Sequence, residues 1–248
     1  MERETRKTSK IRKVYIFKLI GRSIIFLLGI MIYLTHPDAF DVLYGMNFFH
    51  EFSILHLLWV IWVLDMLYQL IPAKAHISLG SQKHFGFRFR PIKEKINKDA
   101  LKNHIISTSK SAYKVFIIWF ILTVVLGALH RMGYLSREIM LLISMCFFVC
   151  DLICVLIWCP FRLMMGNRCC TTCRIFNWYH LIMFSHLIFT GGFYCLSLFV
   201  MSLIVFVVWE MCVLLHPERF WEMTNTALRC SECTDKLCTQ YCQKLRRK

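Results

Sequence analysis

The chain has 248 residues, of which 57% are hydrophobic and 18% are charged, and its formal net charge is +15. Such a composition excludes a single soluble domain with a solvated surface, because the excess of apolar residues has to face lipid. The positive charge does not indicate nucleic-acid binding either, since the basic residues are sorted among separate loops, and no nucleic-acid partner is expected.

The N-terminal residues 1–13 carry six Lys or Arg residues and precede the first apolar segment, residues 14–35. No small-x-small cleavage site follows this segment, so we expect a retained first helix and not a cleaved signal peptide. Hydropathy predicts further membrane spans at residues 52–71, 113–129 and 139–158.

The last apolar stretch, residues 179–215, is too long for one span. Its 37 residues would form a helix of about 55 Å, whereas the hydrocarbon core of a bilayer is about 30 Å thick. We expect a turn at Thr190-Gly191-Gly192, which leaves residues 179–189 as a short tilted span or a re-entrant half-helix. The predicted fold class is therefore all-α, a polytopic transmembrane helical bundle of about six spans, the fifth short or re-entrant.

The basic residues predict the orientation of this bundle. With six spans in the 14–215 membrane domain, one side receives residues 1–13, loops 72–112 and 159–178, and the tail 216–248, which together hold 25 of the 30 Lys and Arg residues. Because cytoplasmic segments are enriched in Lys and Arg, we expect a multi-pass protein of the cell membrane with both termini cytoplasmic. A five-span chain would place the basic tail outside. The expected partners are membrane lipid, with anionic headgroups at the cytoplasmic face, and a homo-oligomer is compatible with the small size.

Two groups of cysteines fall on the predicted cytoplasmic side, where thiols stay reduced. Cys170-x2-Cys173 and Cys230-x2-Cys233 are two-residue knuckles of the type that binds tetrahedral zinc. The last membrane hairpin separates the knuckles and should bring them together. The sequence thus predicts a small cytoplasmic Cys-rich element with a four-cysteine metal site. Zinc is the favoured occupant, and an iron-sulfur cluster is the alternative. Cys169, Cys238 and Cys242 are alternate ligands of this site. The competing interpretation is a set of unligated or palmitoylated juxtamembrane cysteines.

Ionisable residues within the predicted spans form a second candidate site, because charges in lipid are costly and often functional. Their depths below the cytoplasmic boundary are similar, about 8 to 11 Å for the three acids at 1.5 Å per residue. We therefore expect a charged layer in the bundle interior, with Arg22 as a candidate partner of Asp151, formed by Lys18, Arg22, Asp65, Asp151, His186 and Glu210. The alternative is that each side chain reaches toward the headgroups separately.

Other features carry less information. Cys146, Cys150 and Cys154 recur at intervals of four along one span, which is typical of helix packing. His56 and His130 do not form the matched pairs across two helices that haem needs. We find no Gly-rich phosphate loop, Gly-x-Ser-x-Gly elbow or His-Glu-x-x-His helix, so soluble enzyme chemistry is not expected.

The sequence favours a channel or transporter-like protein in which the charged layer contacts the permeant species. Two alternatives stay open. One is a membrane redox protein that passes electrons from a Cys-ligated cluster to a quinone or haem. The other is a non-catalytic membrane scaffold whose basic face recruits lipid or a partner.

Overall fold

The computed structural model describes residues 10–70, 83–85, 89–92, 97–166, 173–233 and 237, and their regular elements are helices, as the sequence predicts. The α-helices are α1 (Lys10–Thr35), α2 (Leu55–Gln69), α4 (Lys98–Arg131), α5 (Arg137–Leu156), α6 (Pro160–Met164), α7 (Tyr179–Phe184) and α8 (Phe193–Leu215). Short 3-10 helices connect them: η1 (Pro37–Leu43), η2 (Asn47–Phe49), η4 (Arg174–Trp178), η5 (Ser185–Phe189), η6 (Pro217–Phe220) and η7 (Thr226–Leu228).

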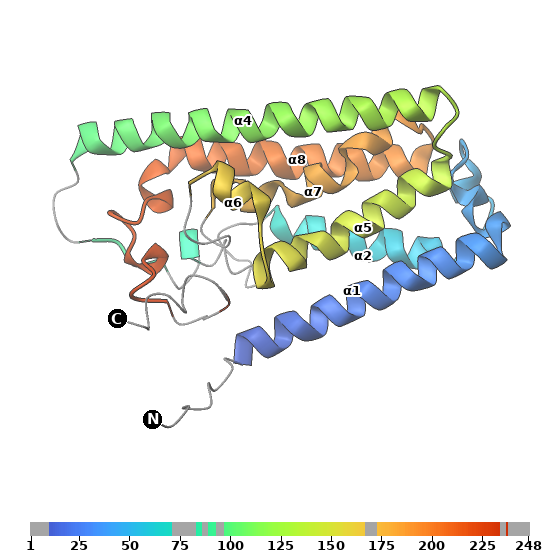
Figure 1. Cartoon of the computed structure of the whole chain (residues 1–248), viewed down its shortest axis with the longest axis horizontal. Helices are drawn as coiled ribbons and strands as arrows, with labels where there is room; N and C mark the ends of the chain where they lie inside the picture. Colours follow the sequence, from blue (N-terminus) through green and yellow to red (C-terminus); the bar gives the residue numbers. More distant parts are fainter. Residues whose placement is uncertain are drawn as a thin grey trace.

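The long helices lie roughly parallel to one axis and alternate in direction (Figure 1). Helices α1 and α4 begin at one end of the bundle, where α8 ends, and η1, η2 and the α4–α5 connection lie at the other end. Among the described residues, four helices are long and apolar enough to cross a membrane, namely α1, α4, α5 and α8, whereas the apolar α2 has 15 residues. Six crossings are therefore not established by helix length alone.

Local sequence explains the helix ends. The side chain of Asn97 accepts hydrogen bonds from the backbone N–H groups of Asp99 and Ala100, at 3.0 and 3.1 Å, and so caps α4. Helix α4 therefore begins well before the predicted span at residue 113, inside a segment that we expected to be a loop. The Ser136 side chain caps α5 in the same way through the Ile139 N–H.

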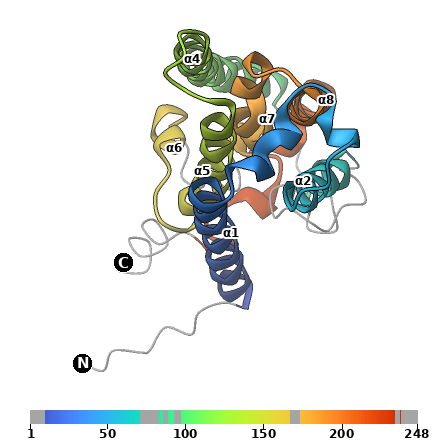
Figure 2. The same ribbon diagram turned by 90° about the vertical axis from the view of Figure 1, so that its right-hand side faces the viewer.

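The segment before α8 is the least regular part of the bundle and lies at its centre. Elements η4, α7 and η5 follow one another without a break from Arg174 to Phe189. If they were collinear, their combined rise would be about 29 Å, because a 3-10 helix rises about 2.0 Å per residue and an α-helix about 1.5 Å. Figure 2 shows α7 surrounded by α2, α4, α5 and α8. We call residues 174–189 the central segment.

The predicted turn after this segment is confirmed. Gly191 and Gly192 have φ values of 69° and 75°, a region that favours glycine. At Gly192 an added Cβ would lie 2.2 Å from the backbone oxygen of Leu43, so the chain needs glycine there for space as well as for conformation. The turn separates the central segment from α8, and Gly192 in the turn packs against the backbone of Leu43 in η1.

Large side chains from α2, α5, α7 and α8 fill the interior. Trp62, Phe184, Tyr194 and Trp209 are almost completely buried in one cluster. On the outside, by contrast, many large apolar side chains of α1, α4 and α8 are exposed, for example Phe17 at 77%. A surface of this kind is typical of helices that contact lipid.

Candidate functional site

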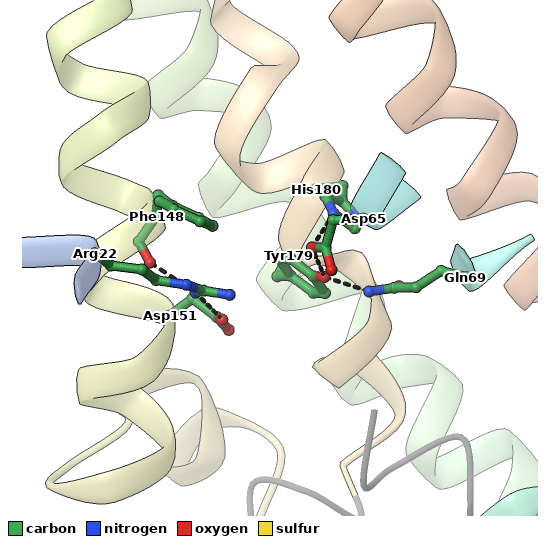
Figure 3. Close-up of polar contacts among 7 residues, drawn as sticks. All are labelled: Arg22, Asp65, Gln69, Phe148, Asp151, Tyr179 and His180. Carbon is green, nitrogen blue, oxygen red and sulfur yellow. Dashed lines mark hydrogen bonds and ion pairs between the residues drawn. The ribbon is translucent and has the colours of Figure 1, made fainter. Parts of the chain in front are cut away.

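A hydrogen-bonded centre around Asp65 connects α2 to the central segment (Figure 3). The Tyr179 hydroxyl donates to Asp65 Oδ2 at 2.7 Å, and His180 Nε2 lies 3.1 Å from the same oxygen. The Gln69 side-chain amide donates to the Tyr179 hydroxyl. Four side chains from two elements thus form a continuous polar chain inside the bundle. We call this the Asp65 centre.

His180 is the most buried member of this centre, with a side chain that is 1% exposed. Its Nδ1 is buried and has no hydrogen-bond partner among the described residues. Since a neutral imidazole carries its proton on one nitrogen, an Nε2–H that donates to Asp65 leaves the Nδ1 lone pair able to accept a proton. The Asp65 carboxylate thus lies directly beside the buried imidazole ring.

A second centre joins α1 to α5 next to the first one (Figure 3). Arg22 donates from Nη1 to Asp151 Oδ2 and to the backbone oxygen of Phe148, both at 2.8 Å. The guanidinium also lies 3.9 Å from the centroid of the Phe148 ring, a cation–π contact. The pairing of Arg22 with Asp151 that depth suggested is therefore present.

A third centre holds Glu210 of α8. Arg174 Nη2 lies 2.5 Å from Glu210 Oε2, and Trp178 Nε1 donates to Oε1 at 2.8 Å. Arg174 also donates to the Ser109 hydroxyl of α4 at 2.7 Å, so this centre connects the start of the central segment to two long helices.

The structure thus distributes the six predicted layer residues over separate centres. His186 is fully buried, and its Nε2 lies 3.0 Å from the Met140 backbone oxygen and 3.2 Å from the Ser144 hydroxyl. Lys18 is exposed and contacts the Tyr15 ring at 5.7 Å. The reason for the separation is that a charge removed from water needs an immediate partner, and each acid takes the nearest donor from an adjacent element.

Sequence reasoning missed six side chains of these centres: Gln69, Ser109, Arg174, Trp178, Tyr179 and His180. Hydropathy assigned Arg174 to a loop and Tyr179 to the boundary of a span, because the central segment begins earlier than its apolar part. The run Trp178-Tyr179-His180, three side chains with polar atoms at the start of an apolar stretch, is the signal that could have identified these three.

The predicted metal site is only partly within the described residues. Cys169, Cys170, Cys238 and Cys242 lie outside them. Cys173 is buried beside Ala112, Val115 and Trp178, and Cys230 and Cys233 are the ends of a turn closed by a backbone hydrogen bond of 3.3 Å. No three His, Cys, Asp or Glu side chains of the described ranges lie close enough to hold a metal ion, so Cys173 is not grouped with Cys230 and Cys233.

One observation is compatible with a shared site. Gly166 and Arg174, on either side of residues 167–172, and Cys230 line the same cavity of about 380 Å³. The metal remains a prediction, which elemental analysis of protein purified without chelator can test. We expect about one equivalent of zinc or iron per chain, and loss of the metal in the Cys230→Ser/Cys233→Ser variant. Protein that contains neither metal would contradict the prediction.

Comparison of the chain with protein-family models, with curated proteins and with solved structures finds no match.

Proposed function

We propose that this chain crosses the membrane six times, with both termini in the cytoplasm. Four helices have the length and composition for a span. The proposal adds α2 and the central segment, whose collinear rise of about 29 Å is close to the thickness of a bilayer core. The alternating directions of these six segments support it, because they bring the start of α1 and the end of α8 to one end of the bundle (Figure 1). Among the described residues, Lys10 and Lys13 lie at the start of α1, Lys98 and Lys102 at the start of α4, and Arg219 just after α8, so this end would contact anionic headgroups.

We further propose that the protein is transporter-like and carries protons or a small cation, with the Asp65 centre as the carrier site. The single observation that supports this function most strongly is the contact of the Asp65 carboxylate with buried His180. Irregular backbone at membrane depth is tolerated where it is enclosed by protein or lines a pathway, and discontinuous helices commonly form the ion sites of transporters. The central segment has both features, since it is irregular and enclosed.

In this mechanism His180 accepts a proton at Nδ1 while Asp65 balances the charge of the imidazolium. His186 lies further along the same segment, toward the Gly191–Gly192 turn, and its buried Nδ1 also has no hydrogen-bond partner among the described residues. Two buried imidazoles on one central segment would provide successive proton positions. The ion pair of Arg22 and Asp151 has a supporting role, because each charge already neutralises the other.

The test is proton flux into liposomes that contain the purified full-length chain and a pH-sensitive dye, driven by a potassium diffusion potential. We expect wild-type protein to conduct and Asp65→Asn to lower the flux at least tenfold, because the neutral amide cannot stabilise an imidazolium. His180→Gln should have a similar effect. Asp38→Asn, at an exposed position in η1, is the matched control and should conduct normally. Wild-type liposomes that leak no faster than empty ones would contradict the proposal, as would full flux in Asp65→Asn.

A further inference from the structure

A second cavity, of about 330 Å³, lies between α4, α5, α6 and the central segment. Six of its sixteen lining residues are aromatic, and they come from all four elements and from the connection between α5 and α6: Trp119, Phe147, Trp158, Phe161, Phe176 and Tyr179. Apolar, aromatic-lined cavities of this size with few polar groups are typical of small-molecule sites. The aromatic residues of the lining favour a planar ligand, because aromatic rings pack best in offset stacks or edge to face.

The charged groups at the cavity indicate that its ligand is neutral. Asp151 is the charged residue among the described lining residues, and Arg22 already neutralises it at 2.8 Å. An ionic ligand would therefore find no unpaired charge of opposite sign in these walls, whereas a neutral ring would lose little hydration on entering from lipid.

Cysteines distinguish this cavity from an ordinary lipid-filled groove. Cys150, Cys154, Cys159 and Cys173 all line it. Cys154, in the last turns of α5, and Cys159, which precedes α6, are five residues apart in the chain and line the same cavity. Two adjacent thiols can become a disulfide if a two-electron acceptor is present. Quinones are neutral, planar, lipid-soluble and accept two electrons, so they match the walls, the charge and the thiols together.

We propose that this cavity binds a quinone and that the Cys154–Cys159 dithiol reduces it. Two S–H bonds break and one S–S bond forms. The two electrons and two protons pass to the quinone, whose two carbonyl groups become the hydroxyl groups of the quinol. Tyr179 lines the cavity and also donates to Asp65, so the reaction takes place beside the Asp65 centre, but it does not depend on ion transport.

The test uses the reduced full-length protein in detergent micelles with decylubiquinone, without oxygen. Binding is followed by quenching of tryptophan fluorescence, to which Trp119 and Trp158 should contribute, and reaction by quinol absorbance and loss of two maleimide-reactive thiols. We expect saturable quenching and one quinol per disulfide. Cys154→Ser and Cys159→Ser should each lower the quinol yield at least tenfold and retain quenching, since serine keeps the size of the side chain. Cys212→Ser, on α8 and not among the cavity residues, is the control and should react like wild type.

The outcomes separate this inference from the transport proposal. Quenching by decylubiquinone that does not saturate would overturn the inference. Quenching by brominated phospholipid that decylubiquinone does not reverse would overturn it too, because it would mean that an acyl chain fills the cavity. Equal quinol yields from wild type and Cys154→Ser would overturn it as well. Proton flux should be unchanged in Cys154→Ser, so that failure of either proposal can be recognised without reference to the other.

Discussion

Replacing Arg22 by alanine should lower the free energy of unfolding by about 3–5 kcal/mol, which is the usual cost of removing one partner of a buried ion pair. The Arg22 and Asp151 side chains are only 15% and 18% exposed, so the carboxylate left behind would keep little water. The Phe148 backbone oxygen would lose its side-chain donor at the same time. Unfolding of the purified protein in detergent micelles by a graded denaturant measures the effect.

Two further variants separate pairing from a general loss of packing. Lys18→Ala removes a positive charge from the same helix at an exposed position, and we expect it to cost about 0.5 kcal/mol or less. The exchange Arg22→Asp/Asp151→Arg should recover part of the stability that either single reversal loses, because it restores opposite charges across α1 and α5. Additive losses in the exchange would show that the two side chains do not depend on each other.

Replacing Gly192 by alanine should also be strongly destabilising, because it disturbs the turn between the central segment and α8. Its φ of 75° and ψ of 152° lie in a region that is essentially restricted to glycine, and strain of this kind costs about 1–3 kcal/mol. The new Cβ would also lie 2.2 Å from the Leu43 oxygen and 3.3 Å from the Gly45 nitrogen. These are backbone atoms that cannot rotate away, so we expect overpacking to add about 1–3 kcal/mol.

Gly191→Ala is the matched control for this prediction. Gly191 also has a positive φ, of 69°, but an added Cβ would meet no atom within 4 Å. It should therefore cost only the conformational strain, about 1–2 kcal/mol. Thermal unfolding followed by tryptophan fluorescence in micelles compares the two variants. Equal losses would contradict the close packing of the turn against η1.

Hydropathy alone was sufficient for most of the bundle. It located the apolar parts of α1, α2, α4, α5 and α8, because lipid exposure imposes long apolar runs, and the glycine pair identified the turn. It did not detect the start of α4, where polar residues follow the Asn97 cap and lie outside the apolar run. It also gave the central segment too late a start, since two short 3-10 helices do not produce the periodicity of an α-helix.

The candidate site was less predictable than the fold. Depth in the membrane suggested that Asp151 and Arg22 meet, because both lie in long regular helices whose rise per residue is known. The partners of Asp65 and Glu210, in contrast, come from the central segment, whose irregular course fixes which side chains face α2 and α8. The course of the central segment is fixed by packing between helices, for example of Phe184 against Trp62. It therefore cannot be predicted from the sequence of any one span.

The orientation of the chain tests the central claim most directly, since the six crossings and the cytoplasmic position of both termini together fix the side on which each loop lies. Epitope tags can be placed at either terminus or in the exposed turn at Gly133 and probed with antibody in intact and permeabilised cells. We predict that the Gly133 tag is detected in intact cells and that both terminal tags are detected only after permeabilisation. A carboxy-terminal tag that antibody reaches in intact cells would contradict the account, because it would mean an odd number of crossings or, if the amino-terminal tag is reached as well, the reverse orientation.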